Sequence, residues 1–363
     1  MLNVKIIDKL SNIKDLEEKW LFLESDIKSS YYHSYYYNYS YFLHLQDSKD
    51  SPFIILIYND KELIAIFPWE KRVKNNLFFT YYEIGPPKHE HIDLTDVVVA
   101  KKHIEFIVKN FSTLLENFPS RAFISTGKVR SDSKWFLIHQ QLSKRKTTKI
   151  VKSKSSSIQT NGKLLQDYIP TKEYKDIKRL KRKINSYGDA IIKIKKGVDV
   201  TIEDMESFYK LESSGWKGEY GTNTAIGLHD NLKRYYNSFV GKNFLQLNIL
   251  TLDNKPIAAQ ICFNNDTELS FPKIAFDENF KKFAPTILLS YAVYELGLKE
   301  NKQLAMNFIT APTWSNKWNP TYFEVYSCQI KLDNITKLIF LYSKFREKIK
   351  TVVKIFVRKL QND

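Results

Sequence analysis

The chain has 363 residues, of which 43% are hydrophobic and 26% charged, so it is long enough for two domains with apolar cores and lacks the composition of a disordered protein. A formal net charge of +16 indicates polyanionic partners such as nucleotide diphosphates, nucleic acid or an anionic membrane surface, unless lysine simply serves as the solvated residue. Because zinc-finger, helix-turn-helix and RNP-type motifs are missing, sequence-specific DNA binding is not expected.

The first part of the chain has the pattern of a small mixed α/β unit. Its periodicity predicts, in order, a strand at 4–8, a helix at Ile13–Ile27, a hairpin at Phe53–Arg72 turning at Asn59-Asp60, a helix at Ile104–Asn117 and a strand at Arg121–Ser125. The tyrosine-rich run Tyr31–Tyr41 is interpreted as an aromatic helix or strand packed between domains, although it could also stack a base or a sugar.

Between Gln140 and Asn161 the chain becomes polar and rich in lysine and serine. This composition predicts an exposed loop or the seam between two domains, with room for a strand at Lys149–Lys152. We therefore divide the chain into a first domain at residues 1–160 and a second at residues 161–363.

From Leu164 a similar order of elements begins again. The predicted elements are a helix at Tyr174–Ser186, a strand at Ala190–Lys195, helices at Ile202–Ser214 and His229–Val240, a hairpin at Phe244–Phe263, a strand at Leu269–Phe276, a helix at Pro285–Leu298, and strands at Leu304–Ile309 and Glu324–Leu332. The repetition predicts an α/β (α+β) fold of two tandem domains, each a mixed central sheet flanked by helices.

The segment KIAFDENFKKFAPTILL (273–289) has the features of a site for coenzyme A. A strand ends in a basic turn that carries Lys281 and Lys282, and an apolar helix then begins. The free N–H groups at a helix start attract a pyrophosphate, which CoA contains. We expect the pyrophosphate on the amides of this turn and helix start, with these cofactor contacts: Lys281, Lys282, Phe283, Ala284, Thr286 and Ile287.

Five segments in order resemble the GNAT-superfamily acetyltransferases related to the CelD proteins of cellulose biosynthesis. They are KDIKRLKRKINSYGD, LESSGWKGEYGTNTAI, NKPIAAQICF, KIAFDENFKKFAPTILL and MNFITAPTWSNKW. The resemblance covers about residues 165–330 and extends to tandem-GNAT peptidyltransferases of the FemABX type and to nucleotide-sugar N-acyltransferases. It departs at Thr286, where the family often has glycine, and in a longer LESSGWKGEYGTNTAI loop. It implies tandem GNAT domains, the first degenerate, and acyl-CoA as co-substrate.

Acyl transfer to an amine needs a bound thioester, a donor for the oxyanion and a deprotonated amine. Glu212 is the first candidate for the base because Trp216, four residues later, could desolvate it; a solvated carboxylate at a helix end is the plainer interpretation. Asp277 is the second candidate, although a turn or cap residue is the more usual role there. Water or the substrate itself could replace both.

Candidate acceptor contacts fall into three groups. Trp216, Lys217 and Tyr220 could shape a pocket or form a packed turn. Lys317 lies in WSNKW, whose tryptophans are more typical of packing.

The third group lies on the basic helix at Tyr174–Ser186. Arg179 and Arg182 are predicted to bind a diphosphate of the acceptor, because a guanidinium binds phosphate through two hydrogen bonds; a merely solvated face is the alternative.

The sequence contains other short motifs that match functional patterns only in part. HEHID (89–93) matches fragments of an acyltransferase and a metallohydrolase pattern, which we interpret as coincidence, and no metal is expected. GxSxG, Walker A, GxGxxG and CxxC motifs are missing. The segment 338–360 predicts a basic amphipathic helix that docks on the second domain or makes peripheral membrane contact.

We expect a cytoplasmic protein for two reasons. The two thiols, Cys262 and Cys328, lie in apolar runs, and the sequence lacks a signal peptide and a long apolar segment. The resulting prediction is an N-acyltransferase that moves an acyl group from acyl-CoA by direct attack to the amino group of a dTDP- or UDP-linked amino sugar used for surface polysaccharide such as O-antigen. The alternatives are an aminoacyl-tRNA-dependent FemABX-like peptidyltransferase, which usually has a long helical hairpin, and a non-catalytic GNAT-like basic module that binds membranes or RNA.

Overall fold

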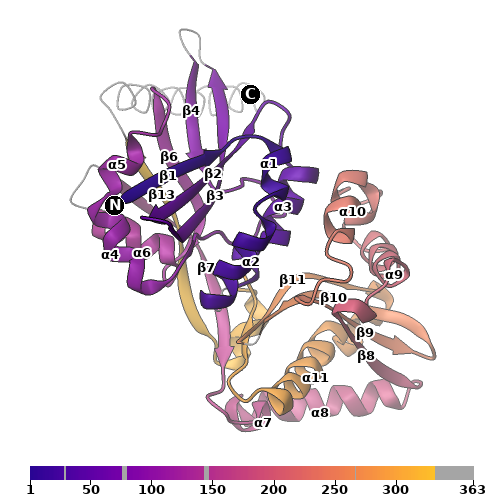
Figure 1. Ribbon diagram of the computed structural model, residues 1–363. Coiled ribbons are helices and arrows are strands. Elements are labelled where there is room, and N and C mark those ends of the chain that lie inside the picture. Colours follow the sequence, from indigo (N-terminus) through magenta and orange to yellow (C-terminus); the bar gives the residue numbers. More distant parts are fainter. Residues whose placement is uncertain (28–29, 76–79, 143–146, 266, 332–363) are drawn as a thin grey trace, which may run out of the picture.

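The computed structural model describes residues 1–27, 30–75, 80–142, 147–265 and 267–331. Within these residues the strands join into one 13-stranded mixed sheet in the order β1-β2-β3-β4-β6-β13-β7-β12-β11-β10-β9-β8, with β5 paired to β3. Figure 1 shows two lobes, one formed by the first part of the chain together with β13 and the other by the second part, with β7 running between them. The predicted mixed α/β fold, with helices flanking a central sheet, is confirmed.

The first lobe holds the strands that precede residue 131. They are β1 (Leu2–Ile7), β2 (Ser51–Asn59), β3 (Glu62–Asn75), β4 (Thr80–Gly85), β5 (Val98–Val99) and β6 (Ala122–Arg130). The helices are α1 (Leu10–Lys14), α2 (Glu17–Ile27), α3 (Tyr35–His44), α4 (Ile104–Lys109), α5 (Phe111–Leu115) and α6 (Lys134–Gln141). The predicted hairpin is confirmed as β2 and β3, with Asp60 at a positive φ of 53° in its turn.

Two predicted helices of this lobe are each broken into two. The helix expected at Ile13–Ile27 is α1 followed by α2, and the helix expected at Ile104–Asn117 is interrupted at Asn110. Asn110 has φ −98° and ψ 14°, outside the helical range, and its side-chain amide donates to the Phe106 carbonyl. Strand β4 and helix α6 were not predicted.

The second lobe contains five strands and five helices among the described residues. The strands are β8 (Ala190–Lys196), β9 (Leu245–Leu252), β10 (Lys255–Asn264), β11 (Glu268–Phe276) and β12 (Ala305–Asn307). The helices are α7 (Leu165–Tyr168), α8 (Thr171–Asn185), α9 (Ile202–Ser213), α10 (Asp230–Asn237) and α11 (Pro285–Glu300). Asp253 and Asn254 both have positive φ, as expected for the tight turn of the predicted β9–β10 hairpin.

Two long strands occupy the middle of the sheet. They are β7 (Thr147–Gln159) and β13 (Thr321–Lys331), which pair with each other, while β13 also pairs with β6 and β7 with β12. The interpretation of 140–161 as an exposed loop is therefore wrong at 147–159, whereas the strand predicted at Lys149–Lys152 is confirmed as part of β7. Ser155, Ser156 and Ser157 are buried in β7, and the hydroxyls of Ser156 and Ser157 donate to backbone carbonyls, which lets a polar sequence enter the sheet.

The tyrosine-rich run is confirmed as an aromatic helix packed between the two halves. Tyr37 of α3 lies about 6 Å from the rings of Tyr235, Phe239 and Phe263, all from the second lobe. The same apolar core also contains Leu56 and other first-lobe residues, so the two halves share one core on this face of the sheet.

The helices of the second lobe cover opposite faces of its sheet (Figure 1). Helices α9 and α10 pack into the core shared with α3, whereas α8 and α11 pack against the other face. No helix of the described residues is long and apolar enough to cross a membrane. The helix predicted at 338–360 lies outside the described residues.

Candidate functional site

Strands β11 and β12 diverge and leave part of an edge open. They pair in parallel only where Glu268–Ser270 meet Ala305–Asn307, and β12 ends there while β11 continues to Phe276. The chain turns away at Ile309, whose positive φ of 63° is strained for a β-branched residue and whose N–H donates to the Asn307 side chain at 2.7 Å. Backbone groups of β11 beyond Ser270 can therefore accept an extended ligand on this side.

The turn after β11 leads directly into α11. A 3₁₀ turn at Glu278–Phe283 is followed by Ala284 with a left-handed φ of 45° and by Pro285 at the first helical position. Among the amides predicted to hold a pyrophosphate, Ala284 N–H donates to Lys281 O and Ile287 N–H to Ala284 O. Since Pro285 has no N–H, the helix start offers fewer free donors than a regular one.

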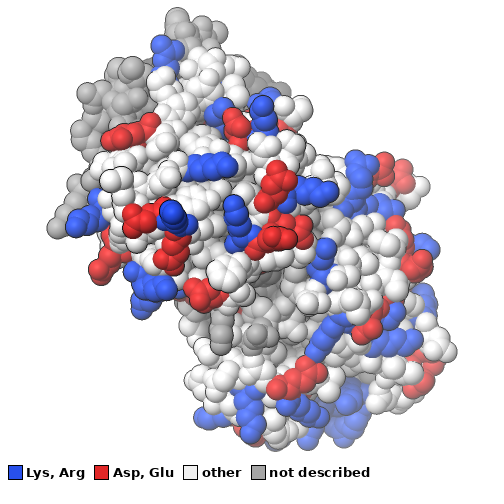
Figure 2. All heavy atoms as spheres, in the orientation of Figure 1, with Lys and Arg blue, Asp and Glu red and all other residues white. Residues whose placement is uncertain are grey.

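The two predicted lysines lie at a rim shared with α8. Lys282 Nζ is 4.8 Å from the centre of the Tyr187 ring, and Lys183 Nζ of α8 is 5.5 Å from that of Phe283. The 3₁₀ turn and the end of α8 therefore form one basic surface. Figure 2 shows Lys and Arg side chains gathered along the lower edge of the molecule, where Figure 1 places α8, while both signs of charge mix elsewhere on this face.

Glu212 is a buried carboxylate whose two oxygens are both bound. Lys217 Nζ lies 2.7 Å from Oε1, and the Ile226 N–H donates to Oε2 at 2.8 Å. The side chain thereby joins the end of α9 to both ends of the glycine-rich loop. A Cβ at Gly218 would lie 2.0 Å from the Ser213 carbonyl oxygen, so the loop needs glycine there.

The loop faces the end of β11 across a small cavity of about 40 Å³. Glu212, Trp216 and Lys217 line it together with Ile274–Phe276. The structure thus brings three of the predicted residues together beside the open part of β11. Tyr220, in the same loop, is fully exposed.

Other predicted residues lie elsewhere. Asp277 accepts from the Asn279 N–H and forms an ion pair with Lys255 at 3.3 Å, as a turn residue does. Arg179 and Arg182 are exposed on α8, which covers the sheet face opposite α9, and Arg179 pairs with Asp176 on its own helix. Lys317 lies 3.8 Å from Glu173. These residues are not grouped with Glu212.

The first lobe adds residues that the sequence interpretation had set aside. Burial, with the positive charges of Lys273, Lys217 and Lys128, lowers the pKa of His91 to about 2, so His91 is neutral. His91 Nδ1 lies 3.1 Å from the Tyr236 hydroxyl of α10, and Lys128 Nζ donates to the His89 carbonyl at 3.0 Å. No spacing in the sequence signals that the charge of Lys217 acts on His91.

Lys273 on β11 is the free cation of this group. It is half-buried, and among the described residues no carboxylate lies within ion-pair distance of it. The neighbouring Asp93 is a weak counter-charge, because burial raises the pKa of its carboxyl group. The junction of the two lobes therefore has an excess of positive charge next to the Glu212–Lys217 pair.

Comparisons with known proteins identify part of the chain. Residues 171–300 match the family model described as an acetyltransferase (GNAT) domain, which spans α8 to α11. No curated protein matches the chain.

Three solved structures share the fold over most of the chain. FemX is 10% identical with a TM-score of 0.60, covering 89% of this chain and 97% of its own. The C-terminal domain of a putative lysylphosphatidylglycerol synthetase from Agrobacterium fabrum is 8% identical with a TM-score of 0.56, covering 90% and 95%. L-PGS from Bacillus licheniformis is 10% identical with a TM-score of 0.56, covering 90% and 96%. At such identities the likeness shows the fold alone.

Proposed function

We propose that this chain is an N-acyltransferase that moves an acyl group from acyl-CoA to the amino group of a nucleotide-linked amino sugar, for surface polysaccharide such as O-antigen. The observation that carries the proposal is the open edge of β11, with a basic helix start at one end and the Glu212–Lys217 pair across it. A GNAT match over residues 171–300 supports an acyl donor.

The proposed donor lies along β11. The amides of its pantetheine arm pair with the free edge beyond Ser270, and its pyrophosphate meets Lys281, Lys282 and the Thr286 end of α11. A backbone N–H of β11 then meets the thioester oxygen as negative charge develops on it. Because CoA thioesters are cytoplasmic metabolites, we place the reaction in the cytoplasm.

The proposed acceptor approaches from the junction of the lobes. Its ammonium group replaces Lys217 on Glu212 Oε1, so the position of Lys217 Nζ at 2.7 Å marks the amine site. The carboxylate takes one proton, and the free amine attacks the thioester carbon. The C–S bond then breaks as the C–N bond forms, and the thiolate leaves with the electron pair and takes up the second amine proton.

Lys273 supports an anionic acceptor. An unpaired ammonium beside Lys217 and Lys128 suits a phosphate of the nucleotide, whereas Arg179 and Arg182 require the nucleotide to reach the other face of the sheet. Both places for the phosphate remain proposals. Variants of Lys273 and of the two arginines distinguish them.

A second candidate is an aminoacyl-tRNA-dependent peptidyltransferase. The similarity to FemX over 89% of this chain favours it about as strongly as the first. The lysylphosphatidylglycerol synthetase likeness points in addition to an aminoacyl group transferred to a lipid. The long exposed row of cations on α8 suits RNA or an anionic membrane surface as well as a nucleotide.

Ligand-dependent stability distinguishes the candidates. A ligand at 100 times its dissociation constant adds roughly 2.7 kcal/mol to stability. Acetyl-CoA should therefore raise the Tm, and release of free thiol should require a nucleotide-linked amino sugar. Stabilisation by aminoacyl-tRNA and none by acyl-CoA would replace the first proposal by the second.

A further inference from the structure

A large cavity of the second lobe lies away from the candidate active site. It has a volume of about 720 Å³, within the range of small-molecule sites. It is bounded by the start of β9, the end of β10 and the C-terminal turns of α11, whereas the proposed donor site is at the opposite end of that helix. At 1.5 Å per residue, Val293, where α11 first lines the cavity, is roughly 12 Å along the helix from Pro285.

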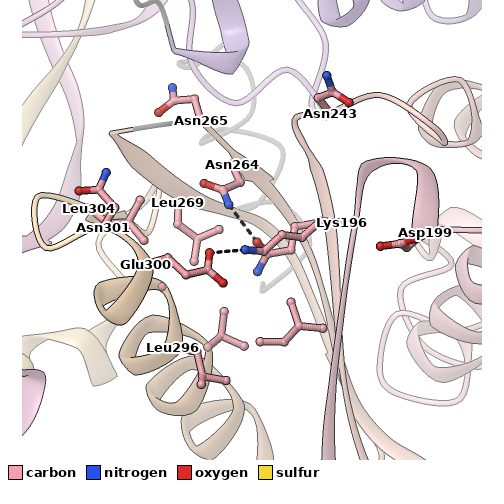
Figure 3. A pocket seen from close by; sticks show the side chains of 14 residues that line it. Lys196, Asp199, Asn243, Asn264, Asn265, Leu269, Leu296, Glu300, Asn301 and Leu304 are labelled. Atoms are coloured by element: carbon pink, nitrogen blue, oxygen red, sulfur yellow. Dashed lines mark hydrogen bonds and ion pairs between the residues drawn. The ribbon is translucent and has the colours of Figure 1, made fainter.

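The walls of this cavity carry an unusual set of side chains. Five carboxamides line it, from Asn243, Gln246, Asn264, Asn265 and Asn301. Figure 3 shows Asn264 close to the Lys196–Glu300 pair, whose charged atoms are 2.5 Å apart, with Leu269 and Leu296 beside them. The oxygens of Gln246, Asn265 and Asn301 already accept hydrogen bonds within the protein. The carboxamides of Asn243 and Asn264 are therefore the ones that best match the hydrogen-bonding pattern of an amide.

The carboxamides continue into the protein as a hydrogen-bonded chain. Asn264 donates to Gln246 at 3.0 Å, and Gln246 donates to Asn248 at 2.8 Å. Asn248 donates to Gln260 at 3.5 Å, which donates to Ser290 of α11 at 2.6 Å. Gln246, Asn248 and Gln260 are buried, where an unpaired amide would be costly, so the chain fixes the orientation of each member. The cavity wall at Asn264 is therefore held in place before any ligand arrives.

The lining also restricts the charge and shape of a ligand. Lys196 and Glu300 neutralise each other, which leaves the exposed Asp199 as the uncompensated charge of the lining and disfavours an anion. Among the described residues no aromatic side chain lines the cavity, so they supply no stacking platform for a nucleotide base. Aliphatic side chains, among them Leu269, Leu296 and Leu304, supply an apolar floor.

We propose that this cavity is a second ligand site for a small uncharged molecule that carries amide groups and an aliphatic side chain, as a short peptide does. The amides pair with the carboxamide wall, and the aliphatic group packs on the leucines. The proposal does not depend on the identity of the acyl donor or acceptor.

The probe is N-acetyl-leucinamide, titrated into the full chain by calorimetry. Two variants remove features of the site: Leu296→Trp fills the cavity, and Asn264→Leu removes the carboxamide that faces it while nearly keeping its volume. Leu296 also borders the groove under α8, whereas Asn264 does not. A loss of binding in Asn264→Leu therefore cannot come from a change in that groove. Leu43→Trp is the control, because Leu43 on α3 is 45% exposed and Leu296 is 43% exposed.

We expect saturable binding to the wild type and to Leu43→Trp, a dissociation constant raised at least about tenfold in both site variants, and weaker binding of the anionic N-acetyl-leucine. Acyl transfer by Leu296→Trp should be unchanged, so failure of this site and failure of the proposed reaction give different results. Lack of saturable binding to the wild type up to about 50 mM, beyond the millimolar range of a weak site, would overturn the proposal. Equal affinity in the wild type and both site variants would overturn it too.

Discussion

Lys217 Nζ lies 2.7 Å from Glu212 Oε1, and the other carboxylate oxygen accepts the Ile226 N–H, so one buried carboxylate holds both ends of the glycine-rich loop. Each oxygen of this carboxylate already accepts one hydrogen bond, and Lys217 occupies the side that faces the loop. We propose that the substrate amine takes the place of Lys217 when Glu212 serves as a general base. The pair is therefore both a structural clamp and the proposed entry point of the acceptor.

Glu212→Gln tests that role. The amide keeps an oxygen for the Ile226 N–H but cannot take a proton, so kcat should fall by about 10²–10⁴-fold, the usual contribution of a positioned base. Acyl-CoA affinity should stay near the wild-type value, measured by titration, while thermal melting should show a lower Tm because the ion pair with Lys217 is lost.

Glu212→Ala is the companion variant, because it removes the acceptor as well. It should lower stability by about 1–3 kcal/mol, since it leaves the buried Ile226 N–H unpaired. Wild-type turnover by Glu212→Gln across pH 6 to 9 would assign the proton to water or to the substrate and leave Glu212 as the clamp alone.

The affinity for acyl-CoA should depend on the two lysines in the turn before α11. Lys281→Glu combined with Lys282→Glu should raise the KM for acyl-CoA about tenfold or more with kcat little changed, because the charges contact the pyrophosphate and not the reacting atoms. Lys302→Glu, an exposed lysine just beyond the other end of α11, is the matched control and should behave as the wild type. Equal KM values in all three proteins would remove the pyrophosphate from this turn.

Much of the fold could be predicted because its elements have strong local signals. The hairpins at Asn59-Asp60 and Asp253-Asn254 have turn residues that tolerate positive φ, and α8 has a clear apolar stripe containing Ile177 and Ile184. Strand β7 could not be predicted in this way. Its serines are buried through hydrogen bonds to chain segments about 150 residues away, and that pairing has no trace in local composition.

The sequence predicted only those residues of the candidate site that lie together in one segment of the chain. Glu212, Trp216 and Lys217 are close in sequence and remain close in space. His91 and Lys128 join them only because the shared sheet and the packing of α3 on α10 bring the lobes together, so no spacing could reveal them. The same long-range packing separates Arg179 and Arg182 from Glu212, although a resemblance had suggested one site.

The stability of the first lobe should depend on pH through Glu24 of α2. Burial raises the pKa of Glu24 to about 8, although the Tyr35 N–H donates to its carboxyl group and, with the nearby Trp20 side chain, opposes the shift. A carboxyl group with a raised folded-state pKa stabilises the fold fully below its unfolded value near 4.5, and that contribution is lost as pH rises toward 8. The free energy of unfolding should therefore fall by at least about 1.4 kcal/mol between these limits, the equivalent of one pKa unit.

Urea unfolding at a series of pH values measures this loss. Glu24→Gln should flatten the dependence in that window, while Glu18→Gln, an exposed position on the same helix, should leave it as in the wild type. An unchanged slope in Glu24→Gln would show that other groups cause it.

The last prediction separates two places for a phosphate of the acceptor. Lys273→Ala removes the unpaired cation at the junction of the lobes and should raise the KM for a nucleotide-linked amino sugar about tenfold or more, with partial recovery in Lys273→Arg. Arg179→Ala and Arg182→Ala, on the opposite face of the sheet, should change it little. The KM for the free amino sugar should not respond to Lys273→Ala, and the effect on the nucleotide-linked acceptor should shrink as salt rises.

A large effect of Arg179→Ala or Arg182→Ala with none of Lys273→Ala would instead put the phosphate on α8. If all three variants keep the wild-type KM, and free and nucleotide-linked sugars are acylated equally well, then neither place binds a phosphate and the nucleotide-sugar proposal fails.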